Sequence, residues 1–224
     1  MVDAKLDSMK PKESGDLDGA VAADLRAVEA IGTALRGTNK PFIGTNATGG
    51  IALAGFSGVL TESVALPGGP RIDTENRVIA FSNEGVCASV VRLPPAVHSR
   101  GRYGFVSGLI DVARATGVSG YLGDGANRRT ASDARDVAQV YRLALESAPA
   151  GSRWHAVAEE NISFRSIAAA IADQLGIPAK QVPQDRPTSS SGSCALSPQW
   201  TIPSQARSRA QRWIGIRLRP DSSR

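Results

Sequence analysis

The hydrophobic pattern along this chain alternates between helical stripes and short apolar runs. Apolar residues between Ala20 and Leu35 recur every three or four positions, which is typical of one helical face. The same spacing predicts four more helices, over 73–83, 105–116, 133–147 and 163–175. We therefore expect residues 1–19 to be loop or disordered and the ordered fold to begin at Ala20.

The apolar runs between these helices are too short for helices and predict strands. The clearest is 86–93, a β-branched run that indicates a strand buried on both faces. Shorter strands are expected over 40–44, 119–122 and 154–158, a polar turn over 45–50, and a loop over 55–70. Strands that alternate with helices predict α/β layers around a mostly parallel sheet.

Pro94 and Pro95 end the strand over 86–93, because proline cannot donate to a strand ladder. Ligands of open α/β sheets bind just beyond the carboxyl ends of the strands. We therefore expect residues 94–102 to be a loop in which a binding site lies.

The amino-acid composition limits the kinds of protein that this chain can be. The chain is 42% hydrophobic and 21% charged, which is ordinary for a globular protein. It contains neither a membrane-length apolar run nor the apolar core of a signal peptide near Met1. Two cysteines, Cys87 and Cys194, and two histidines offer no metal-ligand spacing. We expect a cytoplasmic protein without a metal site and without a membrane partner.

The net charge of +5 comes from the C-terminal segment. Residues 199–224 contain six arginines and a single acid, Asp221, so residues 1–198 are neutral overall. A basic tail can bind nucleic acid. Since no aromatic-basic module or zinc-finger spacing accompanies it, we favour an irregular, solvated basic tail over 183–224 and expect no nucleic-acid partner.

Several segments follow one another in a recognisable order. They are Arg92 to His98, Gly104 to Val106, Gly123 to Asn127, Arg135 to Tyr141, Trp154 to Glu160, Phe164 to Ala168, and a closing turn at Trp213 to Gly215 with Arg219 and Pro220. In this order they resemble the extended and atypical short-chain dehydrogenases/reductases, the NAD-dependent epimerase/dehydratase-like group. The resemblance covers 20–182. It implies a partial Rossmann-like parallel sheet with helices on both faces and a small C-terminal substrate region, roughly 101–130 and 151–182. It also implies NAD or NADP as cofactor and hydride transfer at a carbon–oxygen centre.

The resemblance also implies site residues. Pro94, Pro95, Val97 and His98 match the segment that lies along the nicotinamide. Thr45 and Thr48 fall where the family keeps a catalytic hydroxyl residue. A threonine there can bond a substrate carbonyl, or it can satisfy the backbone of a turn.

Two family features are absent from the sequence. Only 19 residues precede Ala20, too few for the glycine-rich βαβ unit that holds the pyrophosphate, so we expect a truncated domain. The stretch 45–50 is an alternative dinucleotide loop with a degraded glycine pattern. The family's Tyr-x-x-x-Lys pair is also missing, and Arg71 and Glu75 occupy the matching helix. We expect them to form a surface ion pair at i, i+4.

Two hypotheses follow for function. The first is an NAD(P)-dependent oxidoreductase or epimerase-like protein that acts on an unidentified small molecule. The second is a non-catalytic truncated remnant, or an interaction protein, that binds no dinucleotide. The sequence leaves open whether the chain forms a homo-oligomer.

Overall fold

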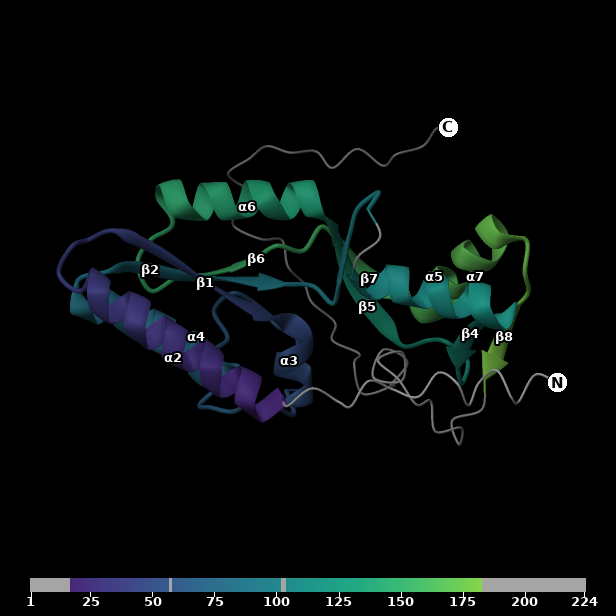
Figure 1. The fold of residues 1–224 in the computed structure, drawn as a ribbon, viewed down its shortest axis with the longest axis horizontal. Helices are drawn as coiled ribbons and strands as arrows, with labels where there is room; N and C mark the ends of the chain where they lie inside the picture. Colours follow the sequence, from purple (N-terminus) through teal and green to yellow (C-terminus); the bar gives the residue numbers. More distant parts are fainter. Residues whose placement is uncertain (1–16, 57, 102–103, 183–224) are drawn as a thin grey trace.

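The computed structural model describes residues 17–182, except 57, 102 and 103. The predictions for 1–16 and for the basic tail over 183–224 lie outside the described residues. Helices and short parallel strands alternate along the described chain, so the predicted α/β class is confirmed. Figure 1 shows two regions that lie end to end, which we name the first and second lobes.

The first lobe is a three-layer sandwich around a parallel sheet. Its strands are β1 (Pro41–Ala47), β2 (Cys87–Leu93) and β6 (Arg153–His155), in the order β1-β2-β6. Its helices are α2 (Leu17–Leu35), α3 (Thr48–Leu53), α4 (Ile72–Ala80) with the 3-10 turn Phe81–Glu84, and α6 (Ala134–Ser147). Helices α2 and α4 cover one face of the sheet and α6 covers the other (Figure 1).

The second lobe is built from shorter strands in two small sheets. One sheet has the order β3-β5-β7, with β3 (Ala96–His98), β5 (Arg128–Asp133) and β7 (Glu159–Ser163). The other pairs β4 (Ser119–Leu122) with β8 (Ala179–Val182). Helices α5 (Gly104–Thr116) and α7 (Phe164–Leu175) lie beside these strands (Figure 1). All described pairings are parallel except β5 with β7.

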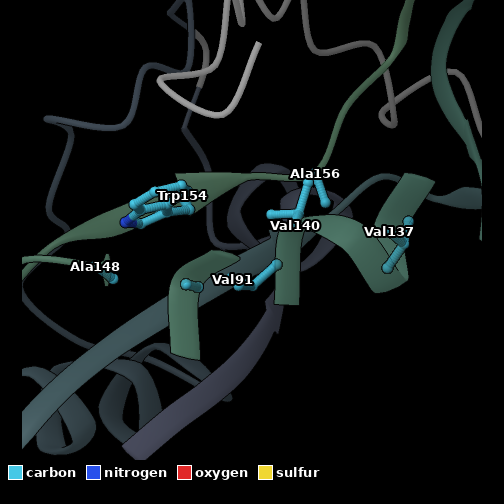
Figure 2. Packing of buried hydrophobic residues seen from close by; sticks show 7 residues of the cluster. Val91, Val137, Val140, Ala148, Trp154 and Ala156 are labelled. Atoms are coloured by element: carbon cyan, nitrogen blue, oxygen red, sulfur yellow. The ribbon is translucent and has the colours of Figure 1, made fainter. Parts of the chain in front are cut away.

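Two apolar clusters fill the first lobe, one on each face of its sheet. Between α6 and the sheet, Val91 and Trp154 pack against Val137, Val140 and Ala148 (Figure 2). On the opposite face, the cluster comprises Val28, Val78, Phe81, Val86, Ala88 and Val90. Val90 and Val91 are 0% exposed although they point to opposite faces, which confirms the prediction of a strand buried on both sides.

Several boundaries differ from the prediction. Helix α2 begins at Leu17, three residues earlier than expected. The predicted polar turn over 45–50 is wrong, because β1 continues to Ala47 and α3 starts at Thr48. Beyond the end of β2, the chain forms a further strand that the sequence did not predict, because Val97 and His98 lie in β3 and pair with β5. Among the described residues, no helix combines the length and the apolar character needed to cross a membrane.

Candidate functional site

The carboxyl ends of β1 and β2 lie side by side, as expected for parallel neighbours at a ligand-binding edge. In the strand register Ala47 is opposite Leu93, and Thr48 is the first residue of α3. The buried Thr48 hydroxyl donates a hydrogen bond to the Leu93 carbonyl at 3.2 Å. Thr48 therefore lies next to Pro94 and Pro95 and fixes the backbone from which that segment leaves the sheet.

Thr45 lies three residues earlier and is exposed at the side of the sheet. Its hydroxyl oxygen is 2.6 Å from the Tyr141 hydroxyl on α6, and its carbonyl accepts from Arg71 at 2.7 Å. Burial raises the pKa of the Tyr141 phenol, and this outweighs the opposing effects of the Thr45 hydrogen bond and the Arg71 charge. Thr45 and Tyr141 thus form a pair of neutral hydroxyls.

Val97 and His98 are held by the second lobe. They pair in parallel with Ser132 and Asp133 of β5, so their backbone groups belong to a strand ladder. The half-buried Val97 packs against the α6 cluster, and His98 Nε2 lies 3.7 Å from a carboxylate oxygen of Glu159. The segment 94–98 therefore links the two lobes and offers mainly apolar side chains.

A buried charge network lies beneath this edge, around Glu75 of α4. Its carboxylate accepts from Arg92 of β2 at 2.6 and 3.1 Å, from Arg153 of β6 at 2.6 Å, and from Asn46 of β1 at 2.7 Å. Burial opposes ionisation of Glu75, but the Arg92 hydrogen bonds and charge, together with Asn46 and Arg153, hold its pKa below the ordinary value. One carboxylate thus binds a residue from every strand of the first-lobe sheet.

Arg92 also fixes the loop over 54–70. Its guanidinium donates to the carbonyls of Val64 at 2.7 Å and Thr61 at 3.3 Å. The backbone N–H of His155 donates to the Glu62 carboxylate in the same loop at 2.8 Å. These bonds explain how a segment without helix or strand is held against the ends of β2 and β6.

His155 is the most buried ionisable side chain of this network, with 0% exposure. Its Nε2 lies 3.4 Å from Arg92 Nη1, and since arginine only donates, the ring proton is assigned to Nδ1. Among the described residues Nδ1 has no hydrogen-bond partner. Burial lowers the His155 pKa to about 4, helped by the Arg92 charge and opposed by Glu75. The ring is therefore neutral at pH 7.

The predicted surface pair of Arg71 with Glu75 is wrong. Glu75 is 3% exposed and binds Arg92 and Arg153, whereas Arg71 forms its ion pair with Asp24 of α2. Sequence reasoning missed this network although a signal was present. A charged residue such as Arg92, inside a run expected to be buried on both faces, needs a buried partner of opposite charge.

Arg129 of β5 is a second buried arginine that sequence reasoning missed. It is 2% exposed, and its guanidinium carbon lies 5.8 Å from the centre of the Phe164 ring. Burial lowers its pKa to about 10, so it stays charged at neutral pH. Among the described residues, no three histidine, cysteine, aspartate or glutamate side chains come close enough to hold a metal ion.

Two proteins of similar sequence come from yeasts. The chain is 43% identical over 169 residues to the uncharacterized protein C2A9.02 of Schizosaccharomyces pombe, covering 75% of this chain and 57% of that protein. It is 36% identical over 166 residues to the uncharacterized protein YLL056C of Saccharomyces cerevisiae, covering 72% and 54%. The chain thus spans little more than half the length of these relatives. No family model matches it.

Solved structures of similar fold have lower sequence identity. A putative epimerase from Burkholderia cenocepacia has a TM-score of 0.65 at 19% identity, over 90% of this chain and 67% of that one. MoeE5 in complex with UDP-glucose and NAD has 0.61 at 20%, over 87% and 64%. DesIV, a dTDP-glucose 4,6-dehydratase from Streptomyces venezuelae with NAD bound, has 0.59 at 20%, over 83% and 58%. The chain therefore has the Rossmann-like α/β fold of NAD-dependent sugar-nucleotide dehydratases and epimerases.

Proposed function

We propose that the chain is an NAD(P)-dependent oxidoreductase or epimerase-like protein of the short-chain dehydrogenase/reductase group, whose described residues form the nicotinamide end of the site. Pro94, Pro95, Val97 and His98 would lie along the nicotinamide. The substrate would be a small molecule with a carbon–oxygen centre, and the ligands of the structural neighbours favour a sugar nucleotide.

One observation carries this proposal. The parallel pairing of β1 with β2 places Thr48 within hydrogen-bonding distance of Leu93, directly before Pro94 and Pro95. A hydroxyl residue and the segment expected along the nicotinamide therefore meet at the carboxyl edge of the sheet, where open α/β sheets bind ligands. In this arrangement Thr48 acts as a positioning residue for the 94–95 turn, while Thr45 is already engaged by Tyr141.

The described residues fit one end of a dinucleotide. The two prolines lack an N–H and Val97 is apolar, so this segment suits the face of a nicotinamide ring. Pyrophosphate needs free N–H groups at a glycine-rich turn before a helix. The stretch that the sequence offers as an alternative dinucleotide loop is 45–50, where Asn46 is buried and bonded to the Glu75 carboxylate, so this alternative is disfavoured.

The chemistry divides between cofactor and protein. A bound nicotinamide would supply or accept the hydride. The chain would orient the ring through 94–98 and exclude water with the loop held by Arg92. At the place that matches the family's catalytic helix, Arg71 is engaged by Asp24 and the Thr45 carbonyl, and the Glu75 carboxylate is bound by Arg92, Arg153 and Asn46. Neither side chain is therefore free to act as a general acid or base.

The lack of a free acid or base at Arg71 and Glu75 favours a second candidate function, a binding protein that catalyses no reaction. In the family, a lysine cation lowers the pKa of a catalytic tyrosine. Here Glu75 lies in the lysine place and is neutralised by Arg92 and Arg153. A chain of this kind would bind a small molecule, or a protein, without hydride transfer.

Calorimetric titration of the 224-residue chain separates the two candidates. The ligands are NAD+, NADP+, NADH and nicotinamide mononucleotide, and sedimentation checks that the protein is folded and uniform. If the chain forms only the nicotinamide end of the binding site, the mononucleotide and the dinucleotides bind with similar Kd values, on the order of 0.1–1 mM. A folded, uniform protein that binds none of the four supports the non-catalytic candidate.

Thr48→Val tests the positioning role of the hydroxyl. It removes the bond to Leu93 at nearly constant volume, and we expect nicotinamide binding to weaken several-fold. Thr116→Val is the matched control, because that hydroxyl bonds the carbonyl of Val112 on α5, away from the edge. Equal affinities of the two variants would contradict the role proposed for Thr48.

A further inference from the structure

The outer side of β1 is an unpaired sheet edge within the described residues. β1 pairs only with β2 there, and Thr45 and Ala47 are exposed although they belong to a parallel sheet. Such edges present a row of N–H and C=O groups that can pair with another strand. A partner strand must match the donors and acceptors of this row.

The strand register identifies which backbone groups point outward. Lys40 C=O accepts from Cys87 N–H, so residues 40, 42, 44 and 46 direct their backbone groups toward β2. Pro41, Ile43, Thr45 and Ala47 therefore direct theirs away from it, and the Ala47 N–H already donates to the Asn46 side chain. Because proline has no N–H, Pro41, Ile43 and Thr45 together present two outward N–H donors and three C=O acceptors.

One acceptor of this row is already occupied. Arg71 donates to the Thr45 carbonyl at 2.7 Å and is held in place by its ion pair with Asp24 of α2. The groups that still need a partner are the N–H of Ile43, the N–H of Thr45, and the carbonyls of Pro41 and Ile43. This leaves two donors and two acceptors.

We propose that two copies of this chain pair antiparallel through the outer edges of β1, with Ile43 opposite Ile43 of the second copy. The two Ile43 residues exchange two hydrogen bonds, and each Thr45 N–H donates to a Pro41 carbonyl across the axis. The residue facing Thr45 C=O is a proline without an N–H, so Arg71 keeps that carbonyl. Every outward group of Pro41, Ile43 and Thr45 is then satisfied, which makes this row self-complementary, as a two-fold interface requires.

Side chains and charges beside the edge fit the same arrangement. Leu145 is 53% exposed one turn after Tyr141, the residue that bonds Thr45, and Ile31 is 49% exposed two turns after Asp24. Two-fold pairing covers both apolar residues on each copy. It also brings the exposed Lys40 of each copy toward Asp24 of the other, which places opposite charges together.

Sedimentation velocity over a range of concentrations tests the association. We expect a monomer–dimer equilibrium, and Leu145→Asp should raise the dimer Kd by about tenfold or more, because it buries a charge at the interface. Val112→Asp is the matched control, because Val112 is 44% exposed on α5 of the second lobe and should leave the Kd unchanged. A wild-type chain that stays monomeric at every concentration overturns the proposal, as does an unchanged Kd for Leu145→Asp.

Disulfide trapping tests the register. In a background with Cys87→Ser and Cys194→Ser, Ile43→Cys places two sulfurs across the axis at a Cα separation near 5.5 Å, within disulfide range. Thr45→Cys is the control, because its nearest copy would be roughly 13 Å away. Rapid oxidation of Ile43→Cys to a linked dimer, with none for Thr45→Cys, is the expected result. Equal trapping of both variants, or trapping of Thr45→Cys alone, excludes this pairing.

Discussion

The two lobes differ in the contacts that connect their strands and helices. The first lobe places charges inside its core and surrounds one carboxylate with donors from three strands. The second lobe uses strands of three to six residues in two small sheets. The first lobe therefore adds long-range polar contacts to the two apolar clusters on its sheet, whereas the second lobe is built from short strand ladders and buries Arg129.

The largest expected effect comes from the charge at the centre of the first lobe. Glu75→Gln leaves Arg92 and Arg153 without their buried carboxylate and should lower the free energy of unfolding by about 3–5 kcal/mol. Urea denaturation measures it. Glu84→Gln is the control, because Glu84 pairs with Arg36 and Arg77 nearer the surface and should change the midpoint far less. Equal losses of unfolding free energy in the two variants would contradict a larger contribution from the Glu75 network.

The second effect depends on pH, and each lobe holds one of the two histidines. Folding lowers the His155 pKa from 6.5 to about 4, so between these values the unfolded chain binds the extra proton. The stability that neutral His155 contributes is complete above pH 6.5 and is lost as the pH falls toward 4. This amounts to about 3 kcal/mol over the whole window.

Urea midpoints measured from pH 4.5 to 7 check this prediction. His155→Gln should flatten the decline in stability, because the variant has no ring to protonate. His98→Gln, in the half-exposed strand β3, should leave the decline as it is in the wild type. A wild-type profile retained by His155→Gln would contradict the assigned burial of a neutral ring.

The third effect compares one helical glycine in each lobe. A Cβ at Gly32 of α2 would lie 2.0 Å from the Phe81 ring, whereas a Cβ at Gly108 of α5 meets nothing within 4 Å. Gly32→Ala should cost about 1–3 kcal/mol of stability through overpacking. Gly108→Ala should add up to about 1 kcal/mol, because alanine is the better helix former. Thermal unfolding gives both values, and a stabilised Gly32→Ala variant would refute the close packing of α2 on Phe81.

The smallest effect concerns one helix cap in each lobe. Asp133 accepts from the Arg135 N–H at the start of α6, and Ser163 accepts from the Ser166 N–H at the start of α7. Each alanine variant should cost about 1 kcal/mol. If the lobes unfold as one unit, both variants shift one shared transition in circular dichroism. Two separated transitions, each moved by one variant alone, would show that the lobes unfold independently.

The sequence was sufficient for five of the helices and for the central strand, but it missed α3 and the strands β3, β5, β7 and β8. Apolar spacing predicted the helices around Val28, Val140 and Ile171, and the run through Val90 and Val91 predicted a strand buried on both faces. The sequence pattern did not predict the strand β5, because Arg128 to Asp133 is polar and shows no apolar alternation. Its strand state comes from pairing with β3 and β7, which local pattern does not encode.

The candidate site was predictable in outline only. The order of strands brought Thr48 beside the 94–95 turn, because parallel neighbours end at the same edge. The partners of Glu75 were not predictable from helical spacing, because Arg92 and Arg153 lie 17 and 78 residues away along the chain. The roles proposed for Thr45, Thr48, Pro94, Pro95, Val97 and His98 stay predictions until binding is measured.

The hydrogen bonds of Asn46, Arg92 and Arg153 to Glu75 have a consequence for how this protein can evolve. A lysine at this position would face Arg92 and Arg153 in a buried space, so three cations would meet where one anion now lies. A lysine at position 75 therefore requires the replacement of both arginines as well, because a single Glu75→Lys substitution leaves buried like charges together. We expect the residues at 46, 75, 92 and 153 to covary among related proteins, because each of them depends on the charge or the hydrogen bonds of the others.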